Sequence, residues 1–196
     1  MIMNGILILS KEKGYTSHDL VSKVKKIAHE KVGHTGTLDP MATGVLPLLI
    51  GEATKLSQYM VEHDKEYEVV LQLGIKTDSA DSEGTVMETK PVPSEALQKE
   101  TVEAVLQTFL GKQKQRPPMY SAIKVKGKKL YEYARQGKQV VVPEREIEIL
   151  QIKLEEIKQK EQTISFWVHC SKGTYIRSLC EDIATKLQTA RLYEGT

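Results

Sequence analysis

One carboxylate stands alone in a glycine-rich segment, residues 33–49, whose sequence is GHTGTLDPMATGVLPLL. Asp39 is the only acid there, whereas metal sites take several ligands and glycosidase chemistry usually takes two acids. A single carboxylate can act as a nucleophile when it stays ionised and is held in one orientation. Pro40 keeps Asp39 out of helical geometry, and Gly36 and Gly44 permit tight turns. The segment therefore indicates an oriented carboxylate, although an Asx-turn at Asp39 is the alternative that spacing alone favours.

A positive partner would keep such a carboxylate ionised, and the best candidate is Arg177. Gly173 and Thr174 are expected to end a strand and open a helix, which places Arg177 in the first helical turn, beside Tyr175. An arginine near a helix N-terminus opposes the helix dipole. That local conflict is easier to understand if Arg177 serves an anion elsewhere, and an ordinary surface arginine is the alternative.

Several other chemistries lack their motifs. The sequence contains neither a Walker A loop nor a Gly-x-Ser-x-Gly elbow. Its two cysteines, Cys170 and Cys180, do not form a CxxC pair, which indicates neither a disulfide framework nor a zinc site. The acidic turn 77–84, TDSADSEG, lacks the ligand spacing of a calcium loop. We therefore expect no metal.

Charge is segregated along the chain. Residues 62–103 hold 11 acids and 4 bases, whereas residues 111–138 hold 9 bases and 1 acid, although the whole chain has a net charge of only +2. The basic segment also carries Tyr120, Tyr131 and Tyr133. Bases meet phosphates and flat rings stack on unpaired nucleobases, so this mixture is typical of an RNA-binding surface. A solvated hairpin is the alternative, and the stiff Pro-Pro pair at 117–118 favours RNA.

Hydrophobic patterns predict the elements that would position these side chains. Thr16 and Asp19 have the spacing of a capping box before a helix whose apolar stripe is Leu20, Val21, Val24, Ile27 and Ala28. Further helices are expected at 52–62 and at 94–109, the second with Ser94 as its cap. A last helix is expected along the apolar stripe Ile176, Leu179, Cys180, Ile183, Ala184 and Leu187. Strands are expected at 6–9, 65–74, 147–157 and 163–170. Helices and strands mix without strict alternation, which favours an α/β (α+β) fold with a mixed or antiparallel sheet.

Length and composition limit the class of protein. A chain of 196 residues, 40% hydrophobic and 28% charged, can form one globular domain or one domain with an insertion. No apolar run approaches the length of a membrane helix, and the N-terminus lacks the basic flank of a signal peptide. With the cysteine content, these features favour the cytoplasm.

Five blocks of the sequence resemble the TruB family of bacterial tRNA pseudouridine-55 synthases. In chain order they are NGILILSKEKGYTSHDLV, GHTGTLDPMATGVLPLLIGEATK, KEYEVVLQLGIKTDSADSEG, QRPPMYSAIKVKGKKLYEYARQG and CSKGTYIRSL. They follow the family's order and span about residues 3–187, so the resemblance is highly specific.

This resemblance implies a pseudouridine-synthase fold, with a curved, mostly antiparallel sheet, flanking helices and a basic insertion. It implies isomerisation of uridine 55 in the T loop of tRNA, with the T-arm stem-loop as partner and without metal, nucleotide or redox cofactor. We also expect a monomer.

The resemblance also implies roles for individual residues. Asp39 becomes the catalytic carboxylate, either a nucleophile or the base that forms a glycal. Tyr67 becomes the tyrosine that stacks on the target base, Arg177 the partner of Asp39, and Tyr175 the aromatic residue beside it. His34 would help to hold the everted T-loop nucleotides. The insertion, about residues 111–143, would fold against the T loop, with RNA contacts expected from Lys11, Lys124, Lys126, Lys128, Lys129, Tyr131 and Arg135.

The C-terminus departs from the family pattern. Family members continue after the last helix through a Leu-Arg-Arg-type segment to a PUA-like domain, whereas this chain ends in QTARLYEGT. We therefore expect residues 1–196 to form a catalytic domain with the insertion and without the PUA-like domain. The alternative function is a tRNA-binding or tRNA-folding protein with weak or no turnover.

Overall fold

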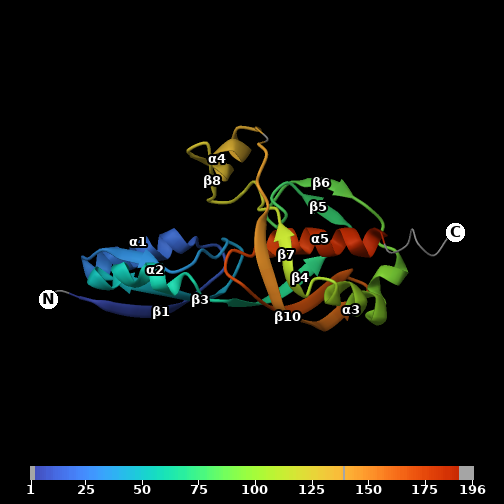
Figure 1. Ribbon diagram of the computed structural model, residues 1–196, viewed down its shortest axis with the longest axis horizontal. Coiled ribbons are helices and arrows are strands. Elements are labelled where there is room, and N and C mark those ends of the chain that lie inside the picture. Colours follow the sequence, from blue (N-terminus) through green and yellow to red (C-terminus); the bar gives the residue numbers. More distant parts are fainter. Residues whose placement is uncertain (1–2, 139, 190–196) are drawn as a thin grey trace. The chain divides into compact units, whose positions relative to one another are not determined.

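The chain folds into two compact units, Met1–His63 and Asp64–Thr196, each with its own core (Figure 1). The computed structural model describes residues 3–138 and 140–189. Every strand pairing within these residues is antiparallel. The C-terminal residues 190–196, where the sequence departs from the family pattern, lie outside the described residues.

The first unit is a three-stranded sheet that carries a helix. Strands β1 (Gly5–Lys11), β3 (Gly44–Ile50) and β2 (Val32–His34) lie in the order β1-β3-β2. Helix α1 (Ser17–Ala28) begins with the predicted capping box, in which Thr16 and Asp19 bond each other's backbone N–H. The core of this unit joins Val21, Leu46 and Leu48 to partly buried neighbours on α1 and the sheet, which are Leu7, Leu9, Leu20, Val24, Val32 and Leu38.

Two predictions for this unit were wrong in detail. Ile27 is 78% exposed, because it lies at the margin of the apolar stripe in the last turn of α1, just before His29 ends the helix in a left-handed conformation. The helix expected at 52–62 is a 3-10 segment, η1 (Gly51–Leu56), followed by the four-residue α2 (Ser57–Met60). No side chain caps either segment.

The second unit is built on a four-stranded sheet in the order β4-β11-β10-β7. Its strands are β4 (Lys65–Gln72), β7 (Gly111–Gln115), β10 (Arg145–Lys158) and β11 (Thr163–Cys170). Helices α3 (Lys99–Gln107) and α5 (Ile176–Thr189) pack against its core. The predicted stripe of α5 is confirmed, since Leu179, Ile183 and Leu187 are buried in the main core and the other three members pack against that core.

The single helix predicted at 94–109 was wrong. A 3-10 turn, η2 (Ser94–Leu97), comes first, and α3 starts only after Gln98. Gln98 has an extended backbone (φ −74°, ψ 136°), which interrupts the helical hydrogen bonds, and Ser94 makes no cap because the N-cap position is Pro93.

Two small hairpins complete the second unit. Strands β5 (Ile75–Thr77) and β6 (Val86–Thr89) frame the acidic turn, and β8 (Lys124–Val125) and β9 (Lys128–Lys129) precede the short helix α4 (Leu130–Arg135). Among the described residues, no helix combines the length and hydrophobicity needed to cross a membrane.

Candidate functional site

The backbone around Asp39 is tied down on both sides of the residue. On one side, the Ser17 hydroxyl accepts a hydrogen bond from the N–H of Leu38 (3.0 Å) and lies 3.3 Å from the Leu38 carbonyl oxygen, to which it donates. On the other side, the Pro40 carbonyl accepts from the backbone N–H of Gly14 (2.9 Å). Asp39 itself closes a turn, because its carbonyl accepts from the N–H of Ala42 (3.0 Å). The loop is thus built to hold one conformation around a half-buried carboxylate.

Lys11 lies beneath this loop and not at the surface. Its side chain is fully buried, and its ammonium donates to the carbonyls of Pro40 and Glu12, each at 3.1 Å. An ammonium in this position is not presented to solvent, so the structure does not support the direct RNA contact that was predicted for Lys11. One of its hydrogen bonds ties it to Pro40, the residue directly after Asp39.

His34 is the last residue of β2 and is half-buried. Burial lowers the pKa of His34 below its usual value, the backbone of Gly36 raises it in part, and the charge of His18 lowers it further. The His34 Nδ1 atom is buried and has no hydrogen-bond partner in the described part of the chain. Burial therefore favours the neutral form of the imidazole.

Arg177 is a largely enclosed arginine of intermediate burial, which excludes the alternative of an ordinary surface residue. It lies in the first turn of α5 and donates to the carbonyls of Ser79 (3.1 Å) and Tyr120 (2.9 Å). Its Nη1 atom lies 3.6 Å from Oδ2 of Asp81, and the two side chains are only 12% and 11% exposed. The charge at this helix N-terminus therefore faces an anion from another segment, Asp81, and the pairing of Arg177 with Asp39 stays a prediction.

Asp81 is a residue that the sequence analysis missed. The acids of turn 77–84 were considered only as cation ligands, and the signal that could have found Asp81 is the position of Arg177 at the wrong end of a helix. The second carboxylate oxygen of Asp81 accepts from the Ser79 hydroxyl (2.7 Å) and the N–H of Glu83 (3.1 Å). One oxygen thus holds the turn while the other faces the guanidinium.

Tyr175, two residues before Arg177, is held through its backbone. The side-chain amide of Gln115, at the end of β7, donates to the Tyr175 carbonyl (3.0 Å) and accepts from the Tyr175 N–H (2.8 Å). Next to it, the buried Ser178 hydroxyl donates to the Arg116 carbonyl (3.0 Å). These bonds fix the start of α5 against the end of β7.

Tyr67 is the third residue of β4 and lies opposite Val168 of β11. It is half-buried and packs at the edge of the main core, on the same side of the strand as Val69 and Leu71. The strand therefore fixes the direction of the ring from one side, which is what a stacking platform requires.

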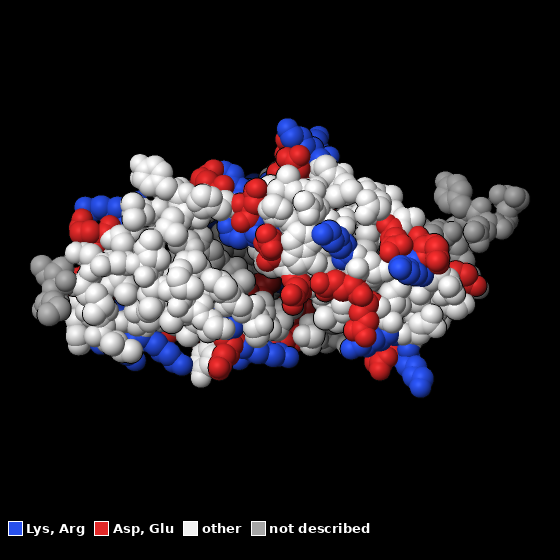
Figure 2. Space-filling view, turned by 90° about the horizontal axis from the view of Figure 1, so that it is seen from below, with Lys and Arg blue, Asp and Glu red and all other residues white. Residues whose placement is uncertain are grey.

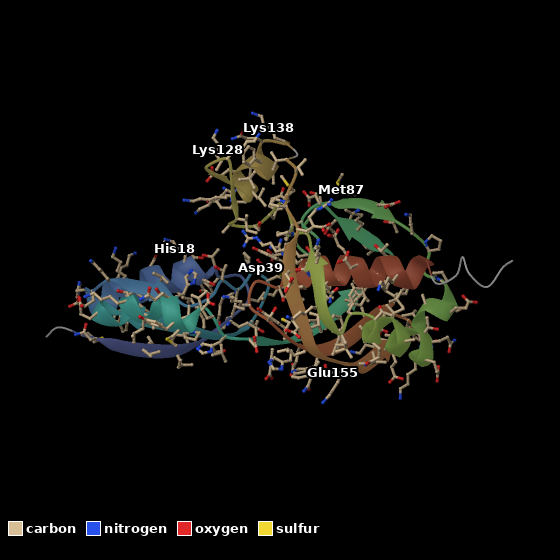
Figure 3. All side chains as sticks on the ribbon, in the orientation of Figure 1. His18, Asp39, Met87, Lys128, Lys138 and Glu155 are labelled. Atoms are coloured by element: carbon tan, nitrogen blue, oxygen red, sulfur yellow. The ribbon has the colours of Figure 1, made fainter. Side chains whose placement is uncertain are left out.

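The basic segment presents its cations on a small folded hairpin. Lys126 and Gly127 both have positive φ (50° and 82°), as a two-residue hairpin turn requires. Fully buried Leu130 anchors the start of α4, and its N–H donates to the Ile123 carbonyl. The side chains that remain exposed include Lys124, Lys126, Lys128, Arg135 and Lys138, two of which are labelled in Figure 3.

Two cations of the basic segment lie close to the ring of Tyr131. The ammonium of Lys129 and the guanidinium of Arg135 each lie 5.4 Å from its ring centre, and Lys129 also donates to its hydroxyl (3.4 Å).

The face of the molecule in Figure 2, in contrast, shows acidic and basic side chains next to one another. Within residues 3–138 and 140–189, no group of three or more His, Cys, Asp or Glu side chains is placed to hold a metal ion.

Comparison with known proteins identifies the family. Residues 24–176 match the family model of the TruB family pseudouridylate synthase (N terminal domain). The chain belongs to the TruB family. The matched range contains His34, Asp39, Tyr67 and the whole basic segment, and Arg177 follows it directly.

Curated members of the TruB family are similar to nearly all of this chain. The chain is 50% identical over 186 residues to tRNA pseudouridine synthase B of Oceanobacillus iheyensis, which covers 94% of this chain and 61% of that protein. It is 51% identical over 190 residues to the protein of the same name from Bacillus subtilis, covering 95% and 61%. The chain thus spans about three fifths of the length of these TruB relatives.

Solved structures support the pseudouridine-synthase fold. A chain in the crystal structure of a Cbf5-Nop10-Gar1 complex is 32% identical, with a TM-score of 0.69 over 93% of this chain and 44% of that chain. A chain in the structure of an H/ACA RNP bound to a substrate RNA containing 2'-deoxyuridine is 29% identical, with a TM-score of 0.65 over 93% and 43%. The predicted fold class of this TruB-family chain is confirmed.

Proposed function

We propose that this chain isomerises uridine to pseudouridine at position 55, in the T loop of tRNA. The observation that carries the proposal is the close similarity to proteins named tRNA pseudouridine synthase B, at about half of all positions over nearly the whole chain. The resemblance of the segments that carry Asp39, Tyr67, Tyr175 and Arg177 to the family's motifs also supports it. We further propose that the chain works as a cytoplasmic monomer.

The reaction moves one glycosidic bond without loss or gain of atoms. The bond from N1 of the base to C1′ breaks, the base turns, a bond from C5 to C1′ forms, and the hydrogen leaves C5 while N1 takes up a proton. Asp39 is the carboxylate that assists at the sugar or base, either as nucleophile or as the base that gives a glycal. Its loop suits both roles, because a carboxylate held through its neighbours' backbone keeps one orientation during the step.

Two further side chains would contact the nucleotides that leave the T-loop stack. A base inside a folded loop must leave its stack before C1′ can be reached. Tyr67 projects from a strand and would stack on the flipped base. His34 has a buried ring nitrogen that makes no hydrogen bond in the described part of the chain, and it would contact the everted nucleotides.

The basic hairpin and α4 would hold the T arm. Exposed lysines on a short, well-anchored hairpin meet phosphates without reading sequence, while shape and unstacked bases give the specificity. Lys124, Lys126, Lys128, Lys129, Tyr131 and Arg135 form this proposed surface.

The experiment that tests the function is tritium release from a T-arm hairpin RNA labelled at C5 of its uridines. C5 loses its hydrogen when it becomes the glycosidic carbon, so release reports the isomerisation itself. The wild-type chain should release tritium, and Asp39→Asn should release none while it still binds the hairpin. Equal release by Asp39→Asn would refute the role of Asp39. Binding without release by the wild type would instead support the alternative, a tRNA-binding or tRNA-folding protein.

A further inference from the structure

We propose that Ser17 and Gln115 are positioning residues for the isomerisation. Each is a buried polar side chain that holds both the N–H and the C=O of one residue in a catalytic segment. Ser17 holds Leu38, directly before Asp39, and Gln115 holds Tyr175, two residues before Arg177. The inference rests on the proposed function, because that function makes Asp39 and Arg177 catalytic.

Ser17 uses its donor and an acceptor on a single peptide neighbour. Its hydroxyl accepts from the Leu38 N–H at 3.0 Å and donates to the Leu38 carbonyl at 3.3 Å, and the side chain is only 2% exposed. Because Ser17 is the first residue of α1, these bonds tie the loop to the start of a helix 21 residues earlier in the chain. Rotation of the backbone that leads into Asp39 would break both bonds.

The far side of Asp39 has its own anchor, so the Ser17 bonds complete a support on both sides. The Pro40 carbonyl accepts from the Gly14 N–H and from the Lys11 ammonium. With Leu38 and Pro40 both fixed, the direction of the Asp39 side chain is limited to its own rotamers. A misplacement of about 1 Å at a reacting group can cost about 100-fold in rate, so this support should affect turnover.

Gln115 makes the equivalent pair of bonds at the start of α5. Its side chain is 4% exposed, its amide nitrogen donates to the Tyr175 carbonyl (3.0 Å), and its amide oxygen accepts from the Tyr175 N–H (2.8 Å). The first N–H groups of a helix have no partner within the helix, so a side-chain acceptor there fixes the position and direction of the first turn. Arg177 lies in that turn, so the direction of the turn sets the direction in which its side chain leaves the helix.

The same two elements offer matched control residues. Ser22 also lies in α1, and no hydrogen bond links its side chain to the loop within the described residues. Gln113 also lies in β7, a strand of the four-stranded sheet that carries none of the residues assigned to RNA contact, and its side-chain amide donates to the Phe109 carbonyl, away from the start of α5. Substitution of these residues makes the same chemical change outside the two catalytic segments.

The test compares Ser17→Ala and Gln115→Met with Ser22→Ala and Gln113→Met, all in the 196-residue chain. Alanine favours helix formation and methionine matches the length of glutamine, so local structure is retained. We expect Ser17→Ala and Gln115→Met to lower kcat for C5 tritium release about 10- to 100-fold, with KM for the T-arm hairpin within about twofold of the wild type. Both control variants should keep the wild-type kcat.

Two further variants separate positioning from stability. Ser17→Thr retains the hydroxyl and should restore most of the kcat that Ser17→Ala removes. Gln115→Glu retains the acceptor for the Tyr175 N–H but removes the donor, so it should lower kcat even if Gln115→Met fails to fold. Unchanged kcat in the folded variants, or an equal decrease in the controls, would overturn the proposal.

Amide hydrogen exchange gives a readout that does not depend on activity. The amides of Leu38 and Tyr175 should exchange slowly in the wild type and at least about tenfold faster in Ser17→Ala and Gln115→Met, respectively. If the wild type releases no tritium but both amides are protected, the proposed function fails while the backbone support stands. Fast exchange at both amides in the wild type would overturn the positioning role whatever the activity.

Discussion

Replacement of Asp81 by asparagine tests whether the buried ion pair holds Arg177. The change removes the charge that faces Arg177 at 3.6 Å and leaves an oxygen for the bonds from the Ser79 hydroxyl and the Glu83 N–H. At an effective dielectric constant of about 20, two unit charges at this separation attract by about 4–5 kcal/mol. Arg177 keeps its bonds to two carbonyls, so the net cost is smaller than this gross attraction.

Removal of one partner of a buried ion pair costs about 3–5 kcal/mol, and the retained amide dipole of asparagine places Asp81→Asn near the lower end of that range. We therefore expect a decrease of about 3 kcal/mol in the free energy of unfolding, measured by urea denaturation at about pH 7. If only half of that cost reaches the transition state, kcat for tritium release falls more than about tenfold.

Asp78→Asn is the matched control, because Asp78 lies in the same turn, is exposed and accepts a backbone bond from Thr85 that asparagine can keep. This variant should unfold within about 0.5 kcal/mol of the wild type and retain its rate. Wild-type stability and rate in Asp81→Asn would show that the charge of Asp81 does not hold Arg177, and the electrostatic reasoning would be wrong.

Three further outcomes follow from the same structure. Burial lowers the pKa of His34, so below about pH 6.5 the folded state binds fewer protons than the unfolded state. The stability that is present above that pH should therefore be lost as the pH falls through the folded pKa. His34→Gln should lack this pH-dependent loss of stability when urea denaturation at about pH 7.5 is compared with that at about pH 5.0. The double variant Lys126→Ala, Lys128→Ala should bind the T-arm hairpin with a weaker salt dependence. The magnitude of the slope of log K against log salt should fall by about 0.7–0.9 for each phosphate that the variant no longer neutralises. An unchanged slope would exclude a role of this hairpin surface in RNA binding. Phe166→Ala, at a fully buried position of β11, should lower the free energy of unfolding by about 3–5 kcal/mol, and a decrease below about 1 kcal/mol would contradict the assignment of Phe166 to the core.

Local patterns predicted the elements whose signals are local. The capping box at Thr16 and the apolar stripe of α5 are confirmed, because a helix start and a helical face depend on residues three or four positions apart. The helix at 94–109 was wrong for the same reason, since a helical period continued across Gln98 although its backbone is extended. Propensity did not distinguish one helix from two short segments.

The hydrogen bonds that build the candidate site could not be found in this way. The bond from Ser17 to Leu38 joins residues 21 apart, that from Gln115 to Tyr175 joins residues 60 apart, and that from Arg177 to Ser79 joins residues 98 apart. No periodicity connects such positions. Lys11 shows the consequence: its residue type suggested a surface contact with RNA, whereas the fold buries its ammonium against two carbonyls.

Arg177 was the exception, because an unfavourable local placement carried long-range information. A guanidinium at the positive end of a helix is destabilising unless an anion from another segment offsets it. The sequence analysis therefore expected an anionic partner for Arg177 and proposed Asp39, which stays a prediction, whereas the turn between β5 and β6 supplies a carboxylate that it did not consider, Asp81 at 3.6 Å. A charged residue that is unfavourable for the dipole of its own helix is better evidence for a site than one that the helix favours, because an interaction outside the helix is needed to explain its position.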